Sequence, residues 1–409
     1  MAAIDPAGAG DCVLEMQGLY GPYSLSERVL QKIWLRQDFS ADELRTVSGQ
    51  RLRIEFPGNW NHLGGPDFKD ARFQIDGTAF CADVEIHFCA EDWIAHGHEN
   101  NPAFNRVRLH VVLHRMPGSY PQVLTESGHC LETLVLLPYL HSDLEAYAMD
   151  EALIEMERIC EHPDLLWFSE LPDTQRLELL REHALSRWRQ KLAFAKKRLE
   201  GIDWREACHQ YGLEVLGYAR NREPMSRIAL RYPLAAFVGL SSDVLFADPD
   251  LNWRLDGLRP ANHPRLRLEQ YVHLVSCRPD WPLALKEAFS KWPIPERMNS
   301  TRAFRKAMSL NRLWENLREG VLCGRIGPIR CNTLIADAFL PLAGAMGWLE
   351  PEACFEYWWH GPSGDCPGVV RRLLRQSGVS HQQQPYCNGL YQGALSLFMS
   401  RGGVLSSRD

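Results

Sequence analysis

The stretch GPDFKDARFQIDGTAFCADVEIHF, residues 65–88, decides what the first part of this chain can be. Apolar and polar side chains alternate over residues 70–75 and again over residues 80–88. The two segments flank Asp76-Gly77, a strong signal for a two-residue turn. We therefore predict a β-hairpin. Because side chains along a strand have a period of two, its second strand points one row to each face: an apolar row of Val84, Ile86 and Phe88, and an ionisable row of Asp83, Glu85 and His87.

The ionisable row has two interpretations. The first is a solvated outer face on a half-buried antiparallel strand, which is the commonest cause of alternation. The second is a metal site, because Asp67 begins the first strand and Glu85 lies in the middle of the second. Pairing of the two strands can bring both carboxylates to one point. Oxygen ligands beside a basic side chain are what Mg²⁺ or Mn²⁺ needs to promote attack of water on a phosphodiester.

Pro66-Asp67, the hairpin and Glu85-Ile86-His87 together resemble the PD-(D/E)XK signature of the restriction-endonuclease-like superfamily, with His87 in the place of the usual lysine. The predicted order of elements is similar to the α-β-β-β-α-β core of that superfamily. It comprises a helix over 25–37, a strand over 51–56, the hairpin, a helical or irregular segment over 91–105 and a strand over 107–114.

This resemblance covers about the first third of the chain, and it implies a function. Asp67 and Glu85 would bind Mg²⁺ or Mn²⁺, with the carbonyl of Ile86 as a third ligand. His87 would position or deprotonate the attacking water, because an imidazole titrates near neutral pH.

A second resemblance extends over most of the chain. The motifs Gly-Pro-Asp-Phe at 65–68, Val-Glu-Ile-His at 84–87, Asp92-Trp93, His96-Gly97-His98 and Leu109-His110-Val111-Val112 together resemble an uncharacterised bacterial family, a domain of unknown function. This resemblance implies no activity.

Two polar side chains outside the hairpin are further candidates for the site. Glu27, in the first predicted helix, either adds to the metal site, as a first-helix acid does in nucleases of this superfamily, or is a first-turn acid favoured by the helix dipole. Asn61 lies in a loop rich in turn-forming residues, 57–65, where it can contact a phosphate or orient a water. Ordinary turn chemistry explains this asparagine equally well.

Histidines are dense in the segment that follows the hairpin, at positions 87, 96, 98, 110 and 114. One interpretation is that His87, one of His96 and His98, and a carboxylate bind Zn²⁺ or Mn²⁺. The other is that Asp92, His96 and His98 form a hydrogen-bonded network that braces the sheet. We expect Mg²⁺ or Mn²⁺ as the cofactor and regard Zn²⁺ as the weaker candidate.

Composition bounds the fold and the partners. The chain has 409 residues, with 45% hydrophobic and 23% charged, as in a soluble globular protein large enough for two domains. A net charge of -6 does not suit a protein that coats nucleic acid, so such contacts must come from local basic patches. The twelve cysteines include no Cys-x-x-Cys pair, which argues against a zinc ribbon.

The predicted domains follow a change of pattern near residue 140. Residues 1–11 are predicted to be a disordered lead-in without the features of a secretory signal. Residues 12–140 form the α/β domain with a mixed sheet, to which the apolar stretches at 122–124 and 134–136 add one or two strands. Residues 141–409 form a mainly helical domain, so the fold class is α+β. No apolar run is long enough to span a bilayer, and we expect a cytoplasmic protein with no membrane partner.

The helical part offers a candidate contact surface for nucleic acid. In the loop 259–267 two prolines precede a predicted helix and display Arg259, Arg265 and Arg267, whose guanidinium groups suit phosphate. The sequence contains no P-loop and no Gly-x-Gly-x-x-Gly in a strand-turn-helix setting, so we expect no nucleotide cofactor.

The function predicted from these residues is metal-dependent hydrolysis of nucleic-acid phosphodiesters. The alternative is a non-catalytic module that keeps the fold and binds nucleic acid or a protein, which the histidine in place of lysine favours. A third interpretation is a histidine-rich metallohydrolase of small molecules. Metal preference separates the three, because Zn²⁺ selects imidazoles and Mg²⁺ selects oxygens.

Overall fold

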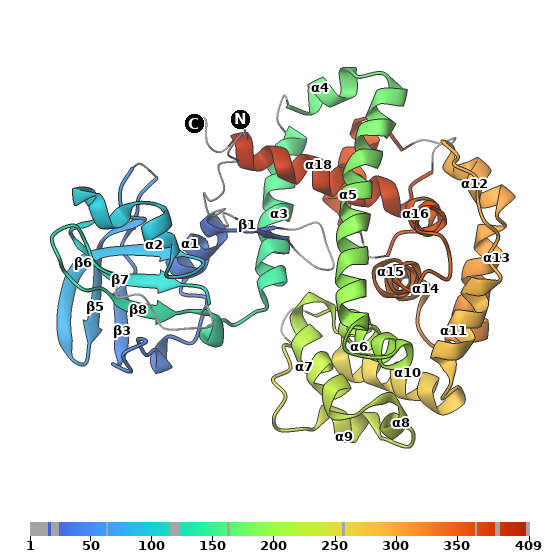
Figure 1. The fold of residues 1–409 in the computed structure, drawn as a ribbon, viewed down its shortest axis with the longest axis horizontal. Coiled ribbons are helices and arrows are strands. Elements are labelled where there is room, and N and C mark those ends of the chain that lie inside the picture. The colour runs from blue at the N-terminus through green and yellow to red at the C-terminus, as the bar shows by residue number, and fades with distance from the viewer. Residues whose placement is uncertain are drawn as a thin grey trace, which may run out of the picture. The chain divides into compact units, whose positions relative to one another are not determined.

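The computed structural model describes residues 15–17, 24–62, 64–114, 123–161, 164–255, 258–364, 366–380 and 385–405. The chain divides into two compact units, the first holding residues 15–17 and 24–148 and the second beginning at residue 149. The first is built on a sheet and the second on helices, which confirms the α+β class (Figure 1). The lead-in predicted for residues 1–11 lies outside the described residues.

The first unit contains a mixed sheet in the order β3-β5-β6-β7-β8. Its strands are β3 (Leu52–Phe56), β4 (Asn59–Trp60), β5 (Phe68–Ile75), β6 (Thr78–His87), β7 (Val107–Val112) and β8 (Glu132–Val135). β5 pairs antiparallel with β3, β4 and β6, whereas β6–β7 and β7–β8 are parallel. A separate antiparallel pair joins β1 (Glu15–Gln17) to β2 (Ser24–Ser26).

The β5–β6 hairpin forms where the sequence predicted it. Asp76 and Gly77 have φ values of 44° and 83°, and positive values at both central residues are what a type I′ turn requires. The Asp76 carboxylate also accepts a hydrogen bond from the backbone N–H of Arg51 at 2.8 Å, which ties the turn to the edge strand.

The ionisable row of β6 is buried, so its interpretation as a solvated outer face is wrong. Asp83, Glu85 and His87 are only 4%, 5% and 1% exposed. The reason is that other elements of the first unit cover the face of the sheet to which these three side chains point. Helix α1 (Glu27–Arg36) packs against β6, and side chains of α2 (Asp92–Ala95) and the segment after it surround the end of the strand.

Short 3₁₀ helices complete the first unit: η1 (Ala41–Glu43), η2 (His98–Asn100), η3 (Pro102–Phe104) and η4 (Leu137–Tyr139). A hydrophobic cluster supports this end of the sheet, and its members are Ala90, Trp93, Phe104, Val107, Val112, Val123 and Leu131. The cluster makes the connection between β6 and β7 a packed segment, which fixes the side chains that it carries.

Among its described residues the second unit contains helices and loops but no strand, and its first helix begins at Leu144, within the first unit. Its helices are α3 (Leu144–Glu161), α4 (Asp164–Glu170), α5 (Asp173–Leu199), α6 (Trp204–Leu216), α7 (Tyr218–Arg231), α8 (Leu234–Phe237), α9 (Ser242–Phe246), η5 (Pro260–Asn262), α10 (Pro264–Cys277), α11 (Trp281–Ser290), α12 (Thr301–Ala307), α13 (Leu310–Glu315), η6 (Asn316–Val321), α14 (Pro328–Leu334), η7 (Ile335–Phe339), α15 (Leu340–Ala345), α16 (Pro351–His360), α17 (Gly368–Gln376) and α18 (Asn388–Leu405). The long helix α5 packs against α15 and α18, as Figure 1 shows. In the part of the chain that the structure describes, no helix has the length and apolar character needed to cross a bilayer.

Candidate metal centre

The hairpin places Asp67 beside Glu85. Phe68 pairs with Val84 in the β5–β6 register, so the residue before Phe68 lies against the residue after Val84. The Asp67 backbone N–H donates a hydrogen bond to Glu85 Oε2 at 2.8 Å, and the backbone N–H of Ile86 donates to Asp67 Oδ2 at 3.0 Å. Each carboxylate is therefore oriented by the backbone of the opposite strand.

Helix α1 brings Gln31 into contact with Asp67 and carries Glu27 nearby. Gln31 Nε2 donates to Asp67 Oδ1 at 2.7 Å, and Gln31 Oε1 in turn accepts from Trp60 Nε1 at 3.2 Å. Glu27 lies four residues earlier, one helical turn away on the same stripe. Its Oε1 is buried and has no hydrogen-bond partner among the described residues.

Burial, with some help from neighbouring negative charges, raises the pKa of these carboxylates. Burial raises the pKa of Glu27 to about 8, and the negative charges of Asp67, Asp92 and Glu85 add to this shift. Burial also raises the pKa of Glu85 to about 8, and burial together with the Glu85 charge holds the pKa of Asp67 well above its usual range. Without a cation these acids therefore retain protons near neutral pH.

Imidazoles line the other side of Glu85. Its Oε1 lies 3.2 Å from His98 Nε2 and 3.6 Å from His87 Nε2. His96 Nδ1 lies 3.1 Å from His87 Nε2, and one ligand atom from each of His87, His96 and His98 falls within 4.8 Å of the other two. His110, which pairs with Glu85 across β6 and β7, places its Nε2 2.8 Å from His87 Nδ1.

Backbone and aromatic contacts fix His96 and His98. Gly97 between them has a φ of 72°, a left-handed conformation that glycine adopts without strain, and it reverses the chain so that both rings reach the same point. The His98 ring stacks on Phe104 with centroids 3.8 Å apart and meets the edge of Trp93 at 5.3 Å.

The four clustered histidines are held neutral. Burial lowers the pKa of His98 to about 4 and that of His110 to about 3. Burial and the neighbouring imidazoles also lower the pKa of His87 and of His96. Neutral rings keep one nitrogen lone pair each, which is the form that binds a metal.

Two predicted residues have structural contacts. Asn61 Nδ2 donates to the Pro66 carbonyl at 2.9 Å, which stabilises the loop that delivers Asp67. Asp92 Oδ2 accepts from the backbone N–H of Cys89 at 2.9 Å, so this buried carboxylate closes the turn after β6. Asn61 therefore stabilises the loop before Asp67 through a hydrogen bond to the backbone, which agrees with its interpretation as a turn residue.

Two residues of the cluster had no assigned role in the sequence analysis. Gln31 could have been found from its spacing of four from Glu27, because that spacing puts both on one helical stripe. His110 was noted only as one of five histidines. Its position opposite Glu85 depends on the parallel register of β6 and β7, which no local pattern encodes.

Comparison with known proteins gives a family. The family model described as "Protein of unknown function (DUF2851)" matches residues 27–247, more than half of the chain. The chain belongs to this family. No curated protein and no solved structure matches it. The DUF2851 match begins with α1 and ends just after α9, so it contains every residue of the cluster around Glu85.

The three arginines predicted to bind nucleic acid lie beyond the DUF2851 match and have different surroundings. Arg259 is exposed, and Arg265 is exposed and pairs with Asp243 at 2.8 Å. Arg267 is only 6% exposed. Its guanidinium donates to Gln270 Oε1 at 2.8 Å and to the Tyr218 hydroxyl at 2.9 Å inside the helical unit. Of the three arginines, only Arg259 and Arg265 are therefore accessible for contact with nucleic acid.

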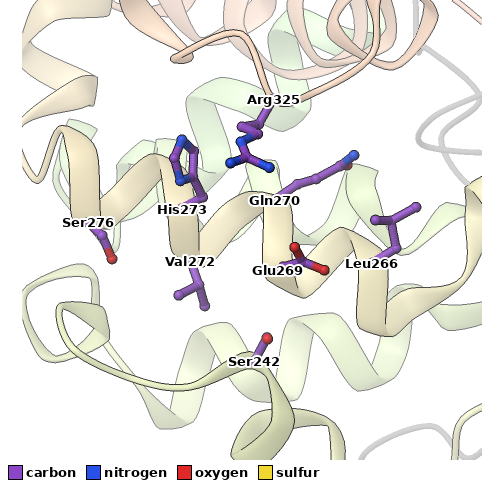
Figure 2. Close-up of a pocket in the computed structure, with 8 residues that line it drawn as sticks. All are labelled: Ser242, Leu266, Glu269, Gln270, Val272, His273, Ser276 and Arg325. Carbon is purple, nitrogen blue, oxygen red and sulfur yellow. The ribbon is translucent and has the colours of Figure 1, made fainter.

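A hollow of about 370 Å³ in the helical unit is also mostly outside the DUF2851 match. Figure 2 shows His273 and Arg325 on the same side of α10. The lining residues are Ser242, Leu266, Glu269, Gln270, Val272, His273, Ser276 and Arg325. The hollow does not gather carboxylates and imidazoles as the first unit does, so the cluster around Glu85 is the stronger candidate for chemistry.

Proposed function

We propose that this protein is a metal-dependent phosphodiesterase that hydrolyses nucleic acid at the cluster around Asp67 and Glu85. The observation that carries the proposal is the reciprocal placement of these two carboxylates across the hairpin, each oriented by the backbone of the other strand. Two acids of this kind, 18 residues apart in sequence, bring hard oxygen ligands to neighbouring positions on the hairpin.

The residues suit a divalent cation. Glu27 contributes a third carboxylate, and its buried Oε1 lacks a hydrogen-bond partner among the described residues. A buried acceptor without a donor is costly unless a proton or a cation satisfies it. The pKa values of Glu27, Asp67 and Glu85 are all raised, chiefly by burial, and a bound cation would stabilise their charged forms.

The arrangement of elements supports phosphodiester chemistry in particular. A helix bearing an acid, then an antiparallel β3-β5-β6 arrangement, a short helical segment and the parallel strand β7 follow the order that the PD-(D/E)XK resemblance implies. His87 occupies the position two residues after Glu85, where that signature has lysine.

Each side chain of the cluster has a separate role in the proposed hydrolysis. Asp67, Glu85 and Glu27 would hold Mg²⁺ or Mn²⁺, which supplies Lewis acidity toward the phosphate and lowers the pKa of water. Gln31 and the Ile86 N–H fix the two oxygens of Asp67. His87, with its Nε2 3.6 Å from Glu85 Oε1, would position or deprotonate the attacking water.

The test is a cleavage assay with the full chain. Single- and double-stranded DNA and RNA are incubated with Mg²⁺ or Mn²⁺, and the wild type is compared with Glu85→Gln and Asp67→Asn. Both variants keep the side-chain shape and remove a ligand charge, so we expect cleavage to fall by at least about 10²-fold with the fold intact. Glu55→Gln is the matched control, because Glu55 is an exposed acid on β3 outside the cluster.

A folded wild type that cleaves none of these substrates with either metal would overturn the proposal. The alternative, a non-catalytic module, would then be the better account, and equilibrium binding of the same nucleic acids would identify its ligand. Cleavage that survives in Glu85→Gln would also contradict it, because such activity must arise elsewhere.

A further inference from the structure

One ligand atom from each of His87, His96 and His98 lies within 4.8 Å of the other two, and Glu85 Oε1 lies beside this group. Glu85 Oε1 lies 3.2 Å from His98 Nε2 and 3.6 Å from His87 Nε2, and His87 Nε2 lies 3.1 Å from His96 Nδ1. Ligands about 2.0–2.1 Å from a tetrahedral metal ion are about 3.3 Å apart from one another, close to these three separations.

His87 Nε2 makes one hydrogen bond, with His96 Nδ1 at 3.1 Å, and Glu85 Oε1 lies beyond hydrogen-bond distance from it at 3.6 Å. The other nitrogen of His87 is already engaged by His110. A cation at the centre would contact a ligand atom of each of the three histidines at once.

We propose that His87, His96 and His98 form a binding site for a transition-metal ion of the Zn²⁺ class, with Glu85 Oε1 beside it. Three imidazole nitrogens favour Zn²⁺ or Co²⁺ over Mg²⁺ or Ca²⁺, which prefer oxygen ligands. This site goes beyond the proposed function and does not depend on it, because the metal binds whether or not a phosphodiester is cleaved.

The surroundings are those of a pre-formed metal site. His110 Nε2 contacts His87 Nδ1 at 2.8 Å and so fixes the orientation of the ring, as outer-shell partners of metal-bound histidines do. Phe104 and Trp93 enclose His98. The two oxygens of Glu85 face different groups. Its Oε2 accepts a hydrogen bond from the Asp67 backbone N–H, and its Oε1 faces the imidazoles.

The experiment is a metal titration of the full chain after removal of bound metal with a chelator. Zn²⁺ affinity is measured by competition with a chromophoric chelator, and the visible spectrum of bound Co²⁺ reports the coordination. The variants are His96→Ala and His98→Ala, whose rings are only partly buried, so that folding is retained and can be checked by thermal melting. His129→Ala is the matched control, an exposed histidine of the same unit.

We expect one Zn²⁺ per chain, with an affinity at least tenfold lower in His96→Ala and in His98→Ala and unchanged in His129→Ala. A wild type that binds no Zn²⁺, or affinities equal to wild type in both cluster variants, would overturn the site. The outcome is separable from that of the proposed function. Zn²⁺ binding without cleavage upholds the site and rejects the nuclease, whereas Mn²⁺-dependent cleavage without Zn²⁺ binding does the reverse.

Discussion

The Asp67 backbone N–H donates a hydrogen bond to the Glu85 carboxylate at 2.8 Å, across the first residues of β5 and the end of β6. The return contact runs from the Ile86 N–H to the Asp67 carboxylate at 3.0 Å. Neither acid can move without breaking a backbone contact of the other strand. The hairpin thus makes the distance between two acids a property of the sheet, and a rigid support of this kind is what a metal centre needs.

Metal binding should release protons. The pKa values of Glu27 and Glu85 are raised to about 8, so both acids are mostly protonated near pH 7 in the metal-free protein. A cation competes with these protons, so Mn²⁺ affinity should rise with pH up to about pH 8 and then level off. Calorimetry near pH 7 in buffers of different ionisation enthalpy measures the release, which we expect to be about one proton or more. An affinity independent of pH would show that these acids are not the ligands.

Gln31 should act as a positioning residue. Gln31→Leu removes the donor to Asp67 Oδ1 and leaves that oxygen free to rotate away from the cation. We expect Mn²⁺ affinity and cleavage to fall about tenfold, as for other outer-shell partners, with little change in thermal stability. Gln74→Leu, on β5 but bonded to Glu55, is the control and should leave affinity unchanged. Equal affinities in the two variants would leave Gln31 with a packing role only.

His87 separates the two metal proposals. His87→Lys restores the usual residue of the PD-(D/E)XK signature but removes a nitrogen ligand from the histidine site. We expect it to keep or raise Mg²⁺-dependent cleavage and to lose Zn²⁺ affinity, while His87→Ala lowers cleavage by about 10²-fold. A lysine variant that is folded, inactive and still binds Zn²⁺ as tightly as wild type would contradict both assignments of His87.

The arginines of the helical unit should differ in what they do. Arg265→Ala breaks only an exposed ion pair, so stability should change by less than about 1 kcal/mol while nucleic-acid binding weakens and becomes less salt-dependent. Arg267→Ala removes a buried guanidinium from Tyr218 and Gln270 and should lower the free energy of unfolding by about 2–3 kcal/mol. Denaturant unfolding and binding titrations at two salt concentrations check this. Unchanged binding in Arg265→Ala and Arg259→Ala would assign the loop to structure.

Local patterns were sufficient for the hairpin. Alternation over 70–75 and 80–88 with Asp76-Gly77 between them predicted β5 and β6, because the type I′ turn and the strand period are both encoded in neighbouring residues. The same holds for the first helix, predicted over 25–37 and found as α1 over Glu27–Arg36.

Contacts between distant segments were not predictable in this way. The alternation of β6 suggested a solvated face as readily as a site, and only the covering by α1 and by the segment after α2 decides between them. Likewise, Arg267 reads as a displayed arginine in the sequence but points inward, because α10 presents that position to Tyr218. Both the burial of the β6 row and the burial of Arg267 result from tertiary packing, which cannot be read from sequence periodicity.

The most direct measurement is anomalous diffraction from crystals of the full chain soaked in Mn²⁺, with Glu85→Gln crystals treated in the same way. The account predicts an anomalous peak about 2.1 Å from carboxylate oxygens of both Asp67 and Glu85 in the wild type, and its loss in the variant. A wild-type map with no peak between these two residues, from crystals that bind Mn²⁺ elsewhere, would contradict the account.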